Sequence, residues 1–420
     1  MNRFLQLFKK KELRNKILFV LGALVVYRLA ANIPVPYIDA DQLRNFFANN
    51  RFYGLLSALT GGSISQLSVV MLALGPYISA SIVMQLLTMI FPGLEQMYKH
   101  EGEAGRARFN QYSRLLTVPF AALQGLAFLV SLQRQGVVSY LDPLQWITVL
   151  GTVVAGSIFL MWLGELISEK NIGNGVSVLI FAGIVSHFPV EFQQAIFKYN
   201  STLFFSYLTF VILALVVVTG VVFISEAQRN IPVNYARRVR GSKVFGGVST
   251  YLPMRINNAG VIPIIFALSL LLFPGMLANF FAGSKVAIIS RVATTVSQHL
   301  QPTSILYAVV YFLLVFLFTY FYTAVTFDPK SISENIQKQG GYIPGIRPGP
   351  ATAQFLYHLL TRITLVGAVF LGIIAVLPNI VQRSTTITDF AVGGTSILIV
   401  VSVALEIMKQ LDAQLSMYEY

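Results

Sequence analysis

Residues with the chemistry for catalysis or metal binding are few and scattered in this sequence. There are no cysteines, which excludes disulfides, thiol nucleophiles and thiolate metal sites together. The four histidines, His100, His187, His299 and His358, show no HExxH or other ligand spacing. The apolar runs also lack the paired aspartates, or the nucleophile with its base, that an intramembrane protease would need. We therefore expect no catalytic residue, no metal site and no cofactor.

The elements available to position a site are apolar segments long enough to cross a membrane. Hydrophobic residues make up 55% of the chain and charged residues 11%, whereas a soluble domain carries about 25% charged residues. Runs that could span a bilayer, allowing for tilt, fall at 17–33, 71–91, 114–132, 146–166, 173–188, 203–224, 259–276, 304–325, 362–380 and 392–408. The sequence predicts an all-α polytopic membrane protein with ten transmembrane helices.

Almost no ionisable residue falls in the middle of a predicted span. Glu165, Glu226 and Glu406 stand at cytosolic ends and Arg28 at an outer end, where a long side chain can reach the interface. Ion-coupled carriers need buried ionisable residues to bind and relay the coupling charge. This absence disfavours two alternatives, an ion-coupled secondary transporter and an intramembrane enzyme, without removing them.

The distribution of lysine and arginine predicts the orientation. If the N-terminus is cytosolic, 22 of the 30 basic residues flank the spans on the inside. The outside loops hold Arg44, Arg51, Arg134, Lys198, Lys285, Arg291 and Arg383. The basic start "MNRFLQLFKKKELRNK" leads into a full-length span, so it is typical of a cytosolic flank rather than a signal peptide. The positive-inside rule then places both termini in the cytosol.

Two predicted cytosolic loops are unusually long. Residues 225–258 contain a basic group, and residues 326–361 contain "GGYIPGIRPGP", in which Arg347 stands between two Pro-Gly pairs. The basic group of the first loop is Arg237, Arg238, Arg240 and Lys243. Long loops in compact proteins are usually functional or disordered, and Pro-Gly stiffening favours docking to an acidic partner. The alternative is plain positive-inside charge with no partner.

Small and mildly polar residues mark the second and fifth runs. In "LGPYISASIVMQLL" (74–87), Ile78, Ile82 and Gln85 recur at i, i+4 and i+7, and Val176 and Ile180 share the i, i+4 spacing. Such spacing places side chains on one helix face. On periodicity alone, ordinary helix–helix packing through small residues is the favoured interpretation.

The stretch "RFYGLLSALTGGSISQLSVV" (51–70) begins with an apolar segment of about two turns, 52–59. A spanning helix needs roughly 20 apolar residues, and a segment this short is not stable on its own. It must therefore dock against apolar neighbours or lie at the membrane interface.

Seven segments occur together in one order along the chain. They are "PYISASIVMQLL", "NIGNGVSVLIFAGI", "NNAGVIPIIFA", "FYTAV", "GYIPGIRPG", "TRITLVGA" and "GGTSILIVV". Together they resemble the bacterial SecY family, the pore subunits of the Sec protein translocon. The resemblance covers essentially the whole chain, from the first span to the tenth.

The resemblance implies a protein-conducting channel in the bacterial inner (plasma) membrane. Such a channel passes unfolded secretory polypeptides across and releases membrane helices sideways through a lateral gate between spans 2 and 7. It also implies two pseudo-symmetric inverted halves of five spans. These would be residues 1–200, with a plug at about 52–62, and residues 201–420, with the large cytosolic loops 225–258 and 326–361.

The resemblance also assigns residues to the pore. The pore ring would be Ile78, Ile82, Val176, Ile180, Ile265 and Ile399. An apolar ring dewets when empty and so blocks ions. The plug would comprise Phe52, Tyr53, Leu55, Leu56 and Leu59, with Gly61 and Gly62 as its hinge. An interfacial re-entrant helix is the alternative for that segment.

The remaining implied sites concern gating and docking. A polar cluster at the lateral gate would comprise Gln85, Thr88, Gln124, Asn257 and Asn258, although each could serve helix packing alone. The basic residues of both long loops would dock the ribosome and the SecA motor ATPase. Further implied partners are the SecE and SecG subunits, signal-sequence-bearing preproteins and membrane lipids. Because no GxxxxGK[ST] motif occurs, the energy for transport would come from outside this chain.

Overall fold

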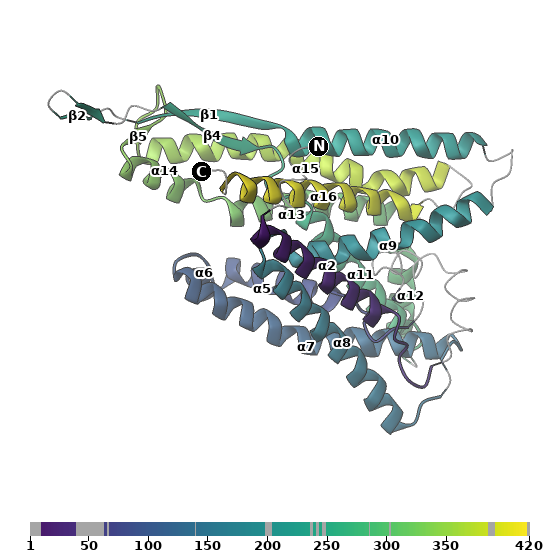
Figure 1. Cartoon of the computed structure of the whole chain (residues 1–420). Helices are drawn as coiled ribbons and strands as arrows, with labels where there is room; N and C mark the ends of the chain where they lie inside the picture. The colour runs from purple at the N-terminus through teal and green to yellow at the C-terminus, as the bar shows by residue number, and fades with distance from the viewer. Residues whose placement is uncertain are drawn as a thin grey trace.

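The chain folds into long helices that run side by side, with a small β-sheet at one end (Figure 1). The computed structural model describes residues 10–38, 63–64, 67–138, 140–197, 204–235, 238–240, 243–245, 249–284, 286–301, 304–384 and 391–417.

Each of the ten predicted apolar runs overlaps one long helix. These ten helices are α2 (Lys11–Ala31), α5 (Gly75–Ile90), α7 (Gly102–Arg134), α8 (Pro143–Glu169), α9 (Gly175–Phe197), α10 (Phe204–Glu226), α11 (Ile262–Ala282), α13 (Ile305–Thr326), α15 (Pro350–Ser384) and α16 (Ala391–Met417). Three shorter helices lie between them: α6 (Pro92–Lys99), α12 (Ala287–His299) and α14 (Pro329–Lys338). Within the described residues, α7, α8, α10, α11, α13 and α15 are long and apolar enough to cross a membrane, and the bent pair α5–α6 is a seventh candidate.

Prolines set the two ends of α5. Pro76 lies in its first turn, where the missing N–H costs nothing and the fixed φ suits a helix. At the other end Phe91 adopts an extended conformation before Pro92, because a residue that precedes proline is disfavoured in the helical region. The chain bends by 111° there and continues as α6.

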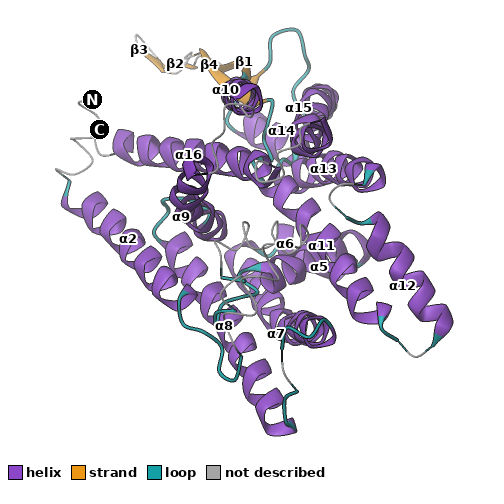
Figure 2. Ribbon diagram, turned by 90° about the vertical axis from the view of Figure 1, so that its right-hand side faces the viewer, coloured by secondary structure: helices purple, strands orange, loops and turns teal. Residues whose placement is uncertain are grey.

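Two groups of helices meet along two seams. In the first part of the chain, α5 and α8 pack on α7, and α2 and α9 pack on α8. In the second part, α13 packs on α11 and α15, and α16 packs on α10 and α15. The groups meet where α11 lies against α5 and α7, and where α9 lies against α16 (Figure 2). The largest hydrophobic core contains residues from both groups.

The segment that leads into α5 lies directly on α8. A Cβ at Gly156 of α8 would lie 2.0 Å from the backbone oxygen of Val69, so only glycine allows this approach. The contact fixes the position of residues 67–74, whose Leu72 and Leu74 are buried. The start of α5 is therefore anchored by the chain that precedes it.

The two long predicted loops fold together into one layer. Strand β1 (Gln228–Tyr235) of the first loop pairs antiparallel with β4 (Ser249–Arg255) and with β5 (Gly341–Tyr342) of the second, in the order β4-β1-β5. Between β1 and β4, the short strands β2 (Arg238–Arg240) and β3 (Lys243–Phe245) form a hairpin.

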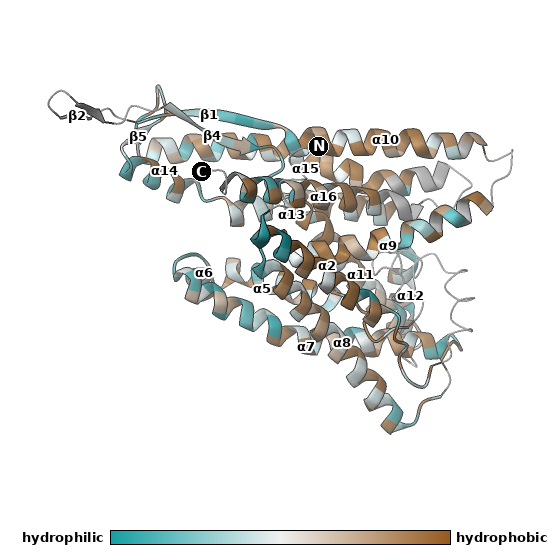
Figure 3. Ribbon diagram, viewed as in Figure 1, coloured by the Kyte–Doolittle hydropathy of each residue, from teal (hydrophilic) through white to brown (hydrophobic). Residues whose placement is uncertain are grey.

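This layer has its own hydrophobic core. Ile231 and Val233 alternate along β1 and are buried with Ile336 of α14 and Leu356 of α15. The sheet and α14 make one end of the molecule hydrophilic, while the long helices are mostly apolar (Figure 3). The all-α prediction is therefore incomplete, because a small sheet joins the two loops that it left without structure.

Candidate functional site

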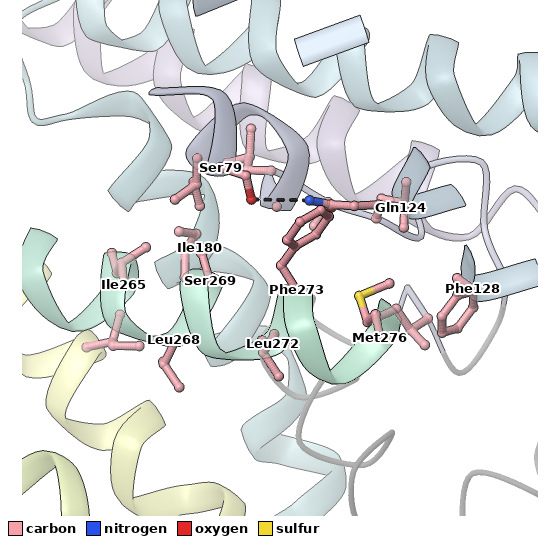
Figure 4. Close-up of a pocket in the computed structure, with 17 residues that line it drawn as sticks. Ser79, Gln124, Phe128, Ile180, Ile265, Leu268, Ser269, Leu272, Phe273 and Met276 are labelled. Carbon is pink, nitrogen blue, oxygen red and sulfur yellow. Dashed lines mark hydrogen bonds between the residues drawn. The ribbon is translucent and has the colours of Figure 1, made fainter. Parts of the chain in front are cut away.

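An apolar cavity of about 100 Å³ lies among α5, α7 and α11 (Figure 4). Of the described side chains that line it, only Ser79, Gln124 and Ser269 are polar. Cavities lined by aliphatic and aromatic groups stay dry, because water there would lack hydrogen-bond partners. This site can therefore hold apolar groups and oppose the passage of ions.

Four of the six residues predicted for the pore ring line this cavity. They are Ile78 of α5, Ile180 of α9, Ile265 of α11 and Ile399 of α16. The structure thus brings together isoleucines from four helices that are far apart in the sequence.

The other two predicted ring residues lie nearby in the core but do not line the cavity. Ile82 is 1% exposed and belongs to the same hydrophobic core as Ile78. Val176 is partly buried and packs against that core. Membership of the ring stays a prediction for all six residues.

A buried hydrogen bond ties α5 to α7 at the cavity wall. Gln124 Nε2 donates to Ser79 Oγ over 3.2 Å, drawn as a dashed line in Figure 4. Both side chains are buried, so the bond satisfies groups that would otherwise be costly to bury. Sequence reasoning selected Gln124 but did not pair it with Ser79. The signal available for the pairing was the small polar run "ISAS".

The facing wall, on α11, is apolar apart from Ser269. Leu268, Leu272 and Met276 line the cavity from this helix, and the Phe273 ring lies 5.9 Å from the Phe120 ring of α7. Among the described residues, no side-chain hydrogen bond joins α5 to α11. Packing therefore holds α5 against α11, and packing is the main source of helix association in a membrane.

In the described part of the chain, the side chains of the residues predicted for the gate cluster do not bond to one another. Thr88 Oγ1 donates to the backbone oxygen of Gln85 over 2.6 Å, and Asn257 Nδ2 donates to the Gly260 oxygen over 3.2 Å. Gln85 Oε1 and Asn257 Oδ1 are buried without a described partner, and Asn258 is half-buried. Their role at a gate stays a prediction.

The residues predicted to form a plug lie outside the described residues. This holds for Phe52, Tyr53, Leu55, Leu56, Leu59, Gly61 and Gly62. The described chain resumes at Ser63, and Ile64 is one of the residues that line the cavity.

The basic residues of the long loops lie in the layer that the strands form with α14, which we call the hydrophilic layer. Arg238 and Arg240 belong to β2, and Lys243 of β3 stands opposite Arg240 in the hairpin; Arg237 lies outside the described residues. Arg347 is exposed in the turn after β5. Gly345 has a φ of +80°, a conformation that glycine adopts without strain.

Asp328 fixes the start of α14 beneath this layer. Its carboxylate accepts hydrogen bonds from the Ser331 hydroxyl over 2.6 Å and from the Lys330 N–H over 3.0 Å. Partial burial raises the pKa of Asp328, but these hydrogen bonds and the charge of Lys99 together outweigh it and leave the pKa below its usual value. The carboxylate is therefore ionised at neutral pH.

Comparisons with known proteins agree with this arrangement. The sequence model of the SecY family matches residues 68–408. The protein translocase subunit SecY of Thermotoga maritima is 42% identical, over 99% of this chain and 96% of that one. The structure of a protein-conducting channel is similar with a TM-score of 0.65 and 20% identity, over 94% of this chain and 91% of that one. Sec61 in the canine ribosome–channel complex gives 0.60 and 20% over the same shares.

Proposed function

Because the chain belongs to the SecY family, we propose that it is a protein-conducting channel whose polypeptide path passes through the cavity between α5 and α11. The observation that carries this path is the convergence of Ile78, Ile180, Ile265 and Ile399 on one cavity. The chain is a translocation channel rather than an enzyme, and the alternative of an ion-coupled secondary transporter has no support among the relatives.

The ring would seal the channel at rest and surround a polypeptide in transit. Aliphatic side chains dewet a constriction and block ions, yet they offer any passing sequence only weak, nondirectional contacts. Ile82 and Val176 would complete the ring when the surrounding helices move. The segment 52–62 would act as the plug, since Ile64, which follows it closely in the sequence, lines the cavity.

The layout would be ten spans in two inverted halves, residues 1–200 and 201–420. Ten apolar runs that each overlap a long helix support the span number. Leu13, near the start of α2, packs with Leu415 near the end of α16, so both ends of the described chain lie together. The positive-inside rule would put these ends and the sheet in the cytosol of a bacterium. The outer loops would then lie on the opposite side of the inner membrane.

The hydrophilic layer would be the docking platform for partners that supply energy. The β2–β3 hairpin carries Arg238, Arg240 and Lys243, and Arg347 is exposed in the turn after β5. Pairing of β1 with β4 and β5 joins the two loops that carry these basic residues, and the β2–β3 hairpin forms a separate two-stranded sheet between β1 and β4. Phosphate-rich RNA of a ribosome or an acidic face of a SecA-type motor would bind here. SecE and SecG subunits would cover lipid-facing helices.

The lateral gate would be the α5–α11 seam, through which signal sequences leave for the lipid. Gln85, Thr88, Gln124, Asn257 and Asn258 would adjust how readily it opens. Interhelical hydrogen bonds in membranes contribute about 0.6 kcal/mol on average, which an inserting apolar helix can replace.

Site-specific photocrosslinking tests the polypeptide path. A photoreactive residue at Ile78 or Ile265 should crosslink to a stalled secretory chain, whereas one at Leu313, exposed on α13, should crosslink to lipid. Absence of polypeptide crosslinks at both cavity positions, in a complex shown to hold its substrate, would place the path elsewhere.

A further inference from the structure

Arg134, the last residue of α7, reaches across the seam to the C-terminal end of α11. Its Nη1 donates to the backbone oxygen of Phe280, and its guanidinium carbon lies 5.5 Å from the centre of the Phe280 ring. A planar guanidinium can donate a hydrogen bond and stack on an aromatic face at once. The contact therefore joins a helix of the first group to a helix of the second.

The C-terminal end of α11 offers a site for such a cation. The last four carbonyl groups of a helix lack partners inside it and carry partial negative charge. The oxygen of Ala282 accepts from Ser290 Oγ over 2.6 Å, and that of Phe281 accepts from the Ser284 N–H over 2.9 Å. Arg134 supplies the donor for the oxygen of Phe280.

Gly283 leaves the space in which the guanidinium lies. A Cβ at Gly283 would lie 2.7 Å from Arg134 Nη1 and 3.1 Å from its Cδ. Gly283 has a φ of −92°, so alanine fits the backbone there, and only the arginine would have to move. The chain thus provides a way to displace Arg134 without removing its charge.

Arg134 is also a charge on the side where the positive-inside rule disfavours it, so membrane orientation does not account for it. We propose that Arg134 is a gate-positioning residue: with the Phe280 backbone oxygen and ring it forms an outer latch that favours the closed arrangement of α7 and α11. That this arrangement is the closed state of a channel rests on the proposed function. The contact itself, and its effect on the distance between α7 and α11, do not depend on that function.

Spin-label distances in the full channel complex in lipid nanodiscs test the latch. Because the chain lacks cysteine, labels can be placed at Leu123→Cys on α7 and Ile288→Cys on α12, both exposed. Arg134→Ala and Gly283→Ala should each raise the population with longer α7–α12 distances by about fivefold, the effect expected for one lost hydrogen bond. Arg134→Lys should give a smaller rise, because an ammonium lacks the planar fork.

Two controls separate a latch from general loosening. Arg291→Ala removes an exposed outer-side charge of α12 and should leave the distances unchanged. Labels at Leu123 and Ile147, on α7 and α8, should report no change in the Arg134 variants. An unchanged α7–α12 distribution in Arg134→Ala, or in Gly283→Ala if Arg134→Ala does not assemble, overturns the latch. This readout needs no polypeptide in transit, so it is independent of crosslinking at the cavity.

Discussion

Helix α5 has two neighbours at the cavity, and it contacts them in different ways. Against α7 it is tied by the buried bond between Ser79 and Gln124. Against α11 it presents aliphatic side chains such as Ile78, which lines the cavity together with Leu268. Lipid tails can replace aliphatic contacts with little loss, but they cannot replace a hydrogen bond. The difference predicts that α5 and α7 move as a unit and that the α5–α11 seam is where the channel opens.

A charge in the cavity should have the largest effect. Ile265→Lys places an ammonium in an aliphatic site at a cost of about 2.5–3.5 kcal/mol for a central position in a membrane, and the seam should open to water. We expect ion conductance of the resting channel to rise in planar bilayers. Ile265→Leu, which conserves volume, should conduct like the parent. Equal conductance in the lysine variant would show that the cavity does not block ions.

Truncation of a side chain on the α11 wall of the cavity should have the second largest effect. Leu268 is 4% exposed, and large-to-alanine changes at such buried sites cost about 2–5 kcal/mol. Leu268→Ala should lower the thermal unfolding temperature in nanodiscs and increase resting conductance, because it weakens the seam. Leu313→Ala at a half-exposed position of α13 is the matched control. A lower unfolding temperature without altered conductance would mean that Leu268 serves the fold but not the seal.

The hydrophilic layer should respond to acid, whereas the apolar seam should not. Because the pKa of Asp328 is lowered in the folded state, its contribution is complete above its ordinary pKa and is lost as the pH falls below about 4. Loss of an N-cap costs about 1 kcal/mol. Asp328→Ala should speed hydrogen exchange in α14 at pH 7 and remove the acid sensitivity of that helix. If α14 stayed sensitive to acid in this variant, another titratable group would be the cause.

The smallest effect should follow loss of the α5–α7 hydrogen bond. Gln124→Leu removes the donor to Ser79 at a cost of about 0.6 kcal/mol. Hydrogen exchange in the first turns of α5 should accelerate slightly, while resting conductance should stay at the parent level. A large increase in conductance would show that the contacts of α5 with α7 and with α11 do not differ as described.

The sequence predicted local features of this structure better than distant contacts. The i, i+4 spacing, a local property of a helix, singled out Ile78 with Ile82 and Val176 with Ile180. The family resemblance added Ile265 and Ile399, and Ile78, Ile180, Ile265 and Ile399 line one cavity. The sheet was not predicted, since β1 pairs Asn234 with Tyr342, and no pattern within either loop specifies a distant partner. The alternation of Ile231 and Val233 was the only local sign of a strand.

The latch was missed for the same reason. Arg134 and Phe280 are 146 positions apart, and a single arginine at a span end is indistinguishable from any other interfacial charge until the fold brings α7 to α11. The pairing of Gln124 with Ser79 needed the packing of α5 on α7 in the same way.

The most direct test compares the two neighbours of α5 in one preparation. Spin labels at Met89 of α5 and Ile262 of α11 report the opening seam, and labels at Met89 and Leu115 of α7 report the bonded pair. With a stalled secretory chain engaged, the α5–α11 distances should lengthen while the α5–α7 distances stay unchanged. Lengthening of the α5–α7 distances alone, or of neither pair in a complex proven to hold its substrate, would contradict a channel that opens along the apolar seam.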